Sequence, residues 1–374
     1  MKPNTNEQTF FELVRAGLFP GHSARIIVHR SPVDWGEVYR MAEEQSVVGL
    51  VATGLDTLPS SEGPPQAVVL QVIGSTLQLE QRNKAMNEFV AQLIERLRKA
   101  DIYAILVKGQ GIAQCYEKPL WRASGDVDLL LSDINYERAK KLLLPLATDV
   151  ETEYSHFKHQ GMTLDGWVVE LHGTQHSRLS GRVDRMIDSV QTDVFNGGIV
   201  RSWQNGRTQV FLPGTDCDVI FVFTHILHHF FFEGIGLRQI CDWCRLLWTY
   251  RDTLNYGLLE SRIRKAGLMT EWKAFAAFAV EYLGMPVEAM PLYDADERWK
   301  RKADGICQFV MEVGNFGHKQ RRDYSGQAYL VRKIKSTFGR LSDMLRHFRL
   351  FPKDSIVFFG GVLRSGLHAA VRGE

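Results

Sequence analysis

The stretch "VKGQGIAQCYEKPLWRASGDVDLLLSD", residues 107–133, decides how this sequence folds. The β-rich run "IYAILV" leads into its glycine turn, and "VDLLL" predicts a second short, buried strand. Asp126 and Asp128 lie two residues apart where this second strand begins. Because side chains alternate between the two faces of a strand, we expect both carboxylates on one face and Val127 on the other.

Two carboxylates held this close repel each other, and the repulsion has two common outcomes. Either one of them takes up a proton, or a divalent cation binds and both stay ionised. Oxygen ligands of this kind suit Mg²⁺ or Mn²⁺, which keep some waters and recruit substrate phosphates. An Asp-x-Asp pattern also occurs on solvated strand faces and at helix N-caps, so the metal interpretation needs further support from the sequence.

A third acid supplies that support. Glu170 lies in "WVVELHG", residues 167–173, whose apolar residues predict another buried strand. An acid inside an apolar strand needs a partner. We expect Glu170 to complete a metal shell with the two aspartates, or to act as general base on an attacking hydroxyl.

The glycine turn that precedes the aspartates fits an anion. "LVKGQG" leaves a strand and enters a short helix, an arrangement in which backbone N–H groups can face a phosphate. Gly109 permits close approach of the backbone, and Lys108 and Arg122 can add positive charge beside a triphosphate.

Taken in order, "LVKGQGIAQCY", "RASGDVDLL" and "WVVELHG" resemble motifs of the nucleotidyltransferase superfamily that includes polymerase β. The resemblance is closest to its uncharacterised bacterial branch, the NTP_transf_5-type family. That branch has a Lys-Gly turn in place of the commoner Gly-Ser, an arginine shortly before Asp-x-Asp-Leu-Leu, and a later acid followed by Leu-His or a similar pair. The resemblance covers roughly residues 75–260.

The resemblance implies a two-metal transfer of a nucleoside monophosphate from a nucleoside triphosphate (NTP) to an acceptor hydroxyl, with release of pyrophosphate. The implied cofactor is Mg²⁺ or Mn²⁺, and the acceptor is a small molecule, a sugar, a protein or an RNA. The implied catalytic residues and metal ligands are Asp126, Asp128 and Glu170. The implied nucleotide-binding residues are Lys108, Gly109, Gln110 and Arg122.

This sequence departs from the superfamily pattern at two positions. Gln110 replaces the usual serine after the turn glycine, and the third acid is Glu170 rather than an aspartate. These departures leave open an alternative function, a catalytically degenerate member that binds a nucleotide or a partner without chemistry.

The wider pattern predicts an α+β fold with a nucleotidyltransferase-like mixed sheet, flanking helices and an all-helical domain after the sheet. Apolar spacing over residues 66–100 predicts one long helix, or two in line. Four further strand candidates are residues 153–159, 161–165, 167–173 and 208–213. The predicted domains are N-terminal helices (1–65), a nucleotidyltransferase core (66–213), a helical domain (214–317) and a basic helical tail (318–374).

Charge distribution and cysteine content indicate what the basic tail contacts and in which compartment the protein is located. The net charge is +2, but residues 318–374 hold 12 Lys and Arg against 4 Asp and Glu. This basic tail predicts either docking on the acidic remainder of the chain or weak contact with an anionic membrane or nucleic acid. Five scattered cysteines and no candidate signal peptide or membrane span predict a cytoplasmic protein.

One further cluster has two interpretations. Cys241 and Cys244 follow His225, His228 and His229, a combination that zinc sites use. The cysteines lie within an amphipathic helical pattern, however, which favours ordinary core cysteines. In that case His225, His228 and Asp242 can line the cleft that faces the carboxylates.

Overall fold

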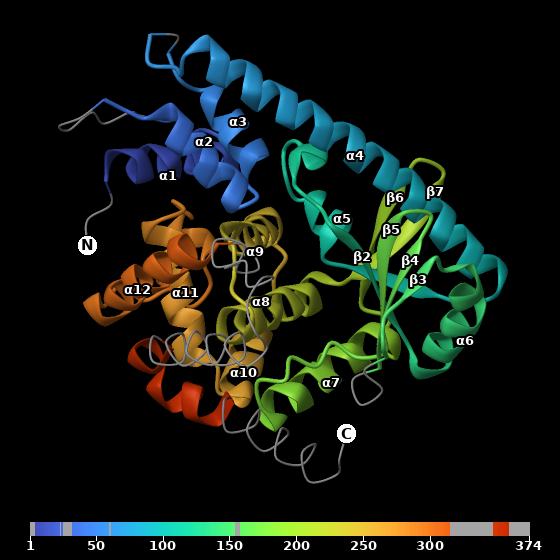
Figure 1. Cartoon of the computed structure of the whole chain (residues 1–374). Helices are drawn as coiled ribbons and strands as arrows, with labels where there is room; N and C mark the ends of the chain where they lie inside the picture. The colour runs from blue at the N-terminus through green and yellow to red at the C-terminus, as the bar shows by residue number, and fades with distance from the viewer. Residues whose placement is uncertain are drawn as a thin grey trace, which may run out of the picture.

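The computed structural model describes residues 4–22, 24, 32–59, 61–153, 158–314 and 347–358. It is an α+β structure in which a mixed seven-stranded sheet is flanked by helices and followed in the chain by a helical part (Figure 1). The predicted fold class is therefore confirmed.

The sheet has the strand order β3-β4-β5-β2-β1-β7-β6. Its strands are β1 (Ala104–Val107), β2 (Asp126–Leu131), β3 (Asp149–Val150), β4 (His159–Leu164), β5 (Trp167–His172), β6 (Val200–Asn205) and β7 (Thr208–Pro213). β2 pairs antiparallel with β1 and parallel with β5. The two strands that carry the three acids are therefore direct neighbours.

The helices surround this sheet and build the rest of the molecule. Before and within the sheet region lie α1 (Thr5–Leu18), α2 (Trp35–Glu44), α3 (Val48–Leu55), α4 (Gln66–Lys99), α5 (Gly109–Ala113), α6 (Asp133–Leu143) and α7 (Gly181–Phe195). The helical part contains α8 (Thr215–Phe232), α9 (Leu237–Tyr250), α10 (Tyr256–Ala266), α11 (Met269–Glu281) and α12 (Glu297–Val313). The N-terminal helices and the helical part share one large hydrophobic cluster, and the sheet has another with α4 and α6.

The two faces of β2 have different neighbours. Val127, Leu129 and Leu131 are buried in the cluster that joins the sheet to α4 and α6. Leu130, on the opposite face, belongs to the cluster of the helical part. Since residues two apart in a strand share a face, Asp126 and Asp128 point with Leu130 toward the helical part.

α4 is one continuous helix of 34 residues, which resolves the two alternatives for this segment. Figure 1 shows it running from the N-terminal helices to the sheet. Its C-terminal half packs on the sheet through apolar residues at helical spacing, among them Met86, Val90, Leu93 and Leu97. Asn83, fully buried on the same helix, donates to the carbonyl oxygens of Leu120 at 2.7 Å and Arg122 at 2.8 Å. The long helix thereby fixes the chain that leads into β2.

Several elements were not predicted from the sequence, among them β3, β6 and α7. β6 is a mostly exposed edge strand, so it lacks the apolar pattern of a buried one. α7 buries Val183, Ile187, Val190 and Val194, which have helical spacing, and Ser180 caps its N-terminus. That spacing and cap are visible in the sequence. The candidates at 153–159 and 161–165 correspond to the single strand β4, while residues 154–157 lie outside the described part of the chain.

A short segment of the basic tail is described, and it packs on the helical part. Residues 347–350 and 352–358 are helical, and Phe351 and Phe358 are buried. The ring of Phe351 lies 5.9 Å from that of Phe230, and the ring of Phe358 lies 4.8 Å from that of Phe231. For these residues the structure agrees with docking inside the molecule; the rest of the tail lies outside the described residues.

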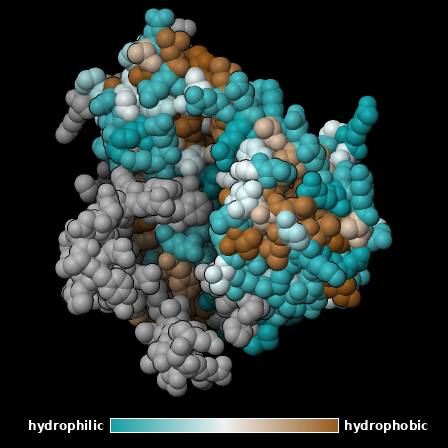
Figure 2. Space-filling view, turned by 45° about the vertical axis from the view of Figure 1, so that its right-hand side comes forward, coloured by the Kyte–Doolittle hydropathy of each residue, from teal (hydrophilic) through white to brown (hydrophobic). Residues whose placement is uncertain are grey.

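Figure 2 shows a largely hydrophilic surface interrupted by apolar areas. Exposed apolar side chains include Leu70, Ile73 and Leu77 on α4 and Ile134 on α6. None of the helices in the described ranges combines the length and the apolar character needed to cross a bilayer.

The crossing of α1 and α3 gives a stability prediction. A Cβ added at Gly54 would lie 2.2 Å from the carbonyl oxygen of Leu13, so Gly54→Ala forces the helices apart. We expect it to lower the free energy of unfolding by about 1–3 kcal/mol, as overpacking does. Gly74→Ala on α4 is the matched control, because a Cβ there meets nothing within 4 Å. The control should stabilise by about 0.5–1 kcal/mol through its helix propensity. Urea unfolding measures both, and a Gly54→Ala protein as stable as the wild type would contradict this packing.

Candidate active site

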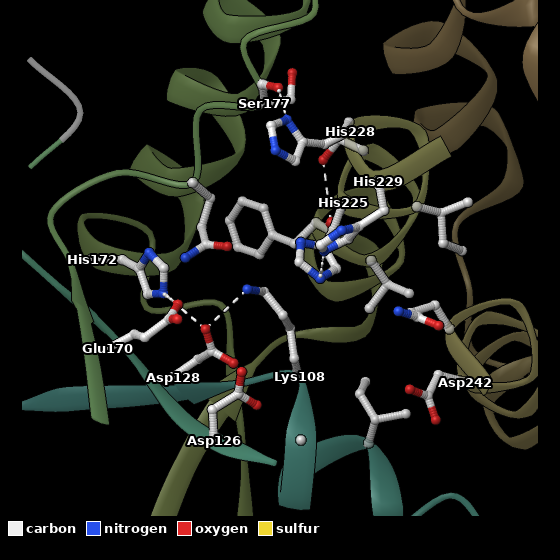
Figure 3. A pocket seen from close by; sticks show the side chains of 18 of the residues that line it. Lys108, Asp126, Asp128, Glu170, His172, Ser177, His225, His228, His229 and Asp242 are labelled. Atoms are coloured by element: carbon white, nitrogen blue, oxygen red, sulfur yellow. Dashed lines mark hydrogen bonds and ion pairs between the residues drawn. The ribbon is translucent and has the colours of Figure 1, made fainter. Parts of the chain in front are cut away.

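A cavity of about 380 Å³ lies between the sheet and helices α8 and α9. Its sheet side carries Lys108, Asp126, Asp128, Glu170 and His172, and its helical side carries His225, His228, Arg238 and Asp242. Figure 3 shows the acidic cluster on one side of the pocket and the histidines of α8 on the other. Its volume falls within the range of small-molecule sites, which is roughly 300–1,000 Å³.

The strand register brings the three acids together. Asp126 and Asp128 share a face of β2, and Asp128 lies directly beside Glu170 of β5 in the parallel pairing. Asp128 is almost fully buried, whereas Asp126 and Glu170 are partly exposed to the pocket. Three carboxylates from two adjacent strands therefore face one cavity.

Lys108 neutralises part of this negative charge. Its Nζ atom lies 2.9 Å from Oδ1 of Asp128, and the contact is shown in Figure 3. Its backbone has φ 56° and ψ −144°, an unfavourable conformation for a residue with a side chain. Such conformations cost on the order of 1–3 kcal/mol and are retained mainly at functional sites. The turn between β1 and α5 thus contains a strained backbone conformation at Lys108, and this conformation places the ammonium group among the carboxylates.

Two histidines complete the sheet side of the pocket. Nε2 of His172 lies 2.8 Å from Oδ1 of Asp128, and Nε2 of His159 lies 3.1 Å from Oε2 of Glu170. Burial opposes ionisation of Asp128 and Glu170, but the histidines and Lys108 outweigh it and lower the pKa of both acids. The pKa of His172 is raised, because the two carboxylates outweigh its burial.

Asp126 differs from the other two acids. It makes no hydrogen bond or ion pair with the described residues. Burial, and then the charges of Asp128 and Glu170, raise its pKa to about 6. A divalent cation between Asp126 and Asp128 would relieve this repulsion, so the donor set fits Mg²⁺ or Mn²⁺.

A second set of donors overlaps the first. The ligand atoms of His159, Glu170 and His172 all lie within 4.8 Å of one another. Imidazole nitrogens suit Mn²⁺, Zn²⁺ and other transition ions better than Mg²⁺. Glu170 belongs to both sets, so this side of the pocket offers oxygen donors alone or oxygen and nitrogen donors together.

Two of the residues expected to bind nucleotide have their side chains engaged elsewhere. Nε2 of Gln110 donates to Oδ1 of Asn83 at 3.0 Å, and the Gln110 side chain is buried beneath the turn. Arg122 does line the pocket, but its Nε and Nη2 atoms donate to the two carboxylate oxygens of Asp242 at 3.1 and 2.5 Å. Tyr116 donates to the same carboxylate at 2.7 Å. In contrast, Lys108 and Gly109 face the cavity.

The structure separates the cysteines of the histidine and cysteine cluster from its histidines. Cys241 and Cys244 are buried in the core of α9, and no metal-binding group among the described residues includes them. His225, His228 and Asp242 line the pocket, as the second interpretation of that cluster predicted. His159 and Arg238 also line the pocket but were not predicted as site residues from the sequence. His159 is recognisable only through its pairing with His172 across β4 and β5.

This geometry defines an α+β protein with a carboxylate-rich pocket suited to cations and phosphates. The chain matches the model of a family described as an uncharacterised nucleotidyltransferase over residues 31–284. The match covers more than half of the chain, so the protein belongs to that family, and the resemblance to this family inferred from its motifs is confirmed. Neither the curated proteins nor the solved structures compared with the chain gave a match.

The raised pKa of Asp126 predicts how stability depends on pH. In an unfolded chain an aspartate titrates near pH 3.9. Between that pH and about 6 the folded protein holds a proton on Asp126 that the unfolded chain has lost, so the contribution of Asp126 to the free energy of unfolding falls as pH rises. In EDTA at pH 7.5, Asp126→Asn should therefore be more stable than the wild type by about 1–3 kcal/mol, and the difference should shrink toward pH 4.

Urea unfolding at several pH values checks this expectation, with Asp149→Asn on the exposed edge strand β3 as the control. Adding Mg²⁺ should stabilise the wild type more than Asp126→Asn. Equal stability of wild type and variant at every pH would contradict the charge repulsion inferred here.

Proposed function

We propose that this protein transfers a nucleoside monophosphate from an NTP to an acceptor hydroxyl and releases pyrophosphate. The observation that carries the proposal is the convergence of Asp126, Asp128 and Glu170 beside the strained Lys108 turn, on one wall of a cavity. Membership of the nucleotidyltransferase family supports the same reaction.

In this proposal each acid has a role that its surroundings favour. Asp126 and Asp128 bind the divalent cations, Mg²⁺ or Mn²⁺, and Glu170 holds the catalytic one. Asp128 and Glu170 are kept ionised by Lys108 and the histidines, so they are available as ligands at neutral pH. Cations bound there neutralise the phosphate oxygens and lower the pKa of the attacking hydroxyl.

The remaining residues orient the substrate. The turn at Lys108 and Gly109 lies against the start of β2 and presents its backbone and ammonium group to the nucleotide phosphates. The acceptor oxygen forms a bond to the α-phosphorus, the bond from that phosphorus to the bridging oxygen of the β-phosphate breaks, and pyrophosphate leaves with that oxygen. The acceptor proton passes to solvent, because Glu170 in this proposal is a cation ligand whose pKa is lowered.

Gln110 and Arg122 take supporting positions in this scheme. Gln110 holds the turn onto α4 through Asn83, and Arg122 is fixed by Asp242. The side-chain hydroxyl that the superfamily commonly offers after the turn glycine is thus replaced by an internal contact. This observation favours the second candidate function, a degenerate member that binds a nucleotide without transferring it.

An activity assay separates the two candidates. The wild type is incubated with each α-³²P-labelled NTP, Mg²⁺ or Mn²⁺ and a cell extract, and labelled acceptors and pyrophosphate are measured. We expect a labelled acceptor, and an Asp126→Ala, Asp128→Ala double variant should lose at least about 100-fold of the rate. Asp149→Ala serves as the surface control, and circular dichroism confirms that each variant is folded.

Metal-dependent NTP binding without pyrophosphate release would support the degenerate candidate and reject transfer. Failure to bind any of the four NTPs by calorimetry would reject both candidates.

A further inference from the structure

Three of the lysine and arginine side chains that line the pocket, those of Lys108, Arg122 and Arg238, have different charge partners. Nζ of Lys108 contacts Asp128, and the guanidinium of Arg122 is held by both oxygens of Asp242. Arg238, from the first turn of α9, is in no ion pair with the described residues. Among the described residues, its hydrogen bond runs from Nη1 to the carbonyl oxygen of Ala123, at 2.9 Å.

The guanidinium of Arg238 is also incompletely hydrogen-bonded. Its Nε atom is buried and has no partner within the part of the chain that the structure describes. Burying a charged donor without an acceptor is energetically unfavourable. Burial lowers the pKa of Arg238, and the neighbouring charge of Arg122 adds to the effect. An arginine nevertheless stays protonated at physiological pH, so the pocket contains a poorly compensated cation.

Helix stability does not explain this cation. Arg238 is the second residue of α9, where the partial positive charge of the helix N-terminus disfavours a basic side chain. Its contact with the Ala123 carbonyl could be made by an uncharged donor at lower cost. The buried charge of Arg238 therefore makes the folded state less stable than folding alone would require, and an anion bound in the pocket would offset this unfavourable free energy.

The opposite wall indicates which anion fits. The charge of Arg238 lowers the pKa of Asp126, and the charge of Asp126 raises the pKa of Arg238, although the two residues form no ion pair. Asp126 on the sheet side and Arg238 on the helical side both line this cavity. A phosphate group that bridges a cation on Asp126 and the guanidinium of Arg238 would satisfy both sides. Arginine suits this role because its planar N–H groups can contact two phosphate oxygens at once.

We propose that Arg238 forms a phosphate-binding subsite on the helical wall, which holds the β- and γ-phosphates of the NTP and then the pyrophosphate product. This inference rests on the proposed function, because it takes an NTP as the substrate. It assigns to Arg238 the electrostatic contact with phosphate that the sequence pattern assigned to Arg122. Arg122 instead uses its charge to join the segment before β2 to α9 through Asp242.

The test compares ligands that differ only in their terminal phosphates. Isothermal titration calorimetry on the full chain with Mg²⁺ measures binding of each NTP, its monophosphate and pyrophosphate to wild type and Arg238→Gln. We expect Arg238→Gln to bind NTP and pyrophosphate about 10- to 100-fold more weakly, and to bind the monophosphate within about threefold of wild type. Arg264→Gln is the control, because Arg264 is an exposed residue of α10 that is paired with Glu260. This variant should bind all three ligands as the wild type does.

The possible results separate this subsite from the proposed function. If Arg238 acts only through Ala123, NTP and monophosphate affinities fall by the same factor, which overturns the subsite. Unchanged NTP affinity in Arg238→Gln also overturns it and leaves nucleotidyl transfer standing. Wild-type binding of NTP with no transfer in any assay rejects the proposed function, while a selective loss in Arg238→Gln still supports the subsite. A wild type that binds neither NTP nor pyrophosphate rejects both.

A second variant covers the case in which Arg238→Gln does not fold. Arg238→Lys keeps the charge but loses the two-point contact with phosphate oxygens. We expect its NTP affinity to fall about 3- to 10-fold, with monophosphate affinity unchanged. A folded Arg238→Lys protein that binds NTP as tightly as wild type would overturn the proposed contact.

Discussion

The pocket depends on the charge balance around Asp128. This carboxylate is almost fully buried, and it stays ionised because Nζ of Lys108 and Nε2 of His172 both contact its Oδ1 atom. The two basic groups come from different elements, the turn after β1 and the end of β5. Their positions are fixed by the pairing of both strands with β2. The ionised state of one side chain therefore requires the correct order of three strands.

That balance leaves Asp126 as the acid of this cluster that makes no hydrogen bond or ion pair with a basic group in the part of the chain that the structure describes. Lys108 and the histidines contact Asp128 and Glu170 and lower the pKa of both acids. Asp126 lines the cavity and has a raised pKa. An external divalent cation is the simplest species that would complete the site. On the helical wall the situation is reversed, because within the described ranges the guanidinium of Arg238 is in no ion pair with a carboxylate. Asp126 could bind the positive metal ion, and Arg238 the negative phosphate groups, of a metal-bound polyphosphate.

The rest of the fold supports these walls. α4 covers the apolar face of the sheet and, through Asn83, fixes both the turn helix and the segment before β2. α8 and α9 form the other wall, and α9 is joined to the sheet side by the Arg122–Asp242 ion pair and by the hydrogen bond from Tyr116. Buried pairs of this kind add little net stability but fix which surfaces meet. The pocket lies on the face of the sheet opposite the sheet's own hydrophobic cluster, and its apolar lining, which includes Ile112, Phe221 and Ile226, belongs to the cluster of the helical part.

The sequence by itself determined the α+β class, the placement of Asp126 and Asp128 on one strand face and the family. These features follow from local patterns, because strand alternation and motif order are readable in one dimension. Only the tertiary structure decided which charges remain free. Asp242 neutralises Arg122 from 120 positions further along the chain, and Gln110 turns to Asn83, 27 positions earlier. His159 reaches Glu170 because β4 pairs with β5. The partner of a charged side chain depends on which elements pack against it, and local sequence does not contain that information.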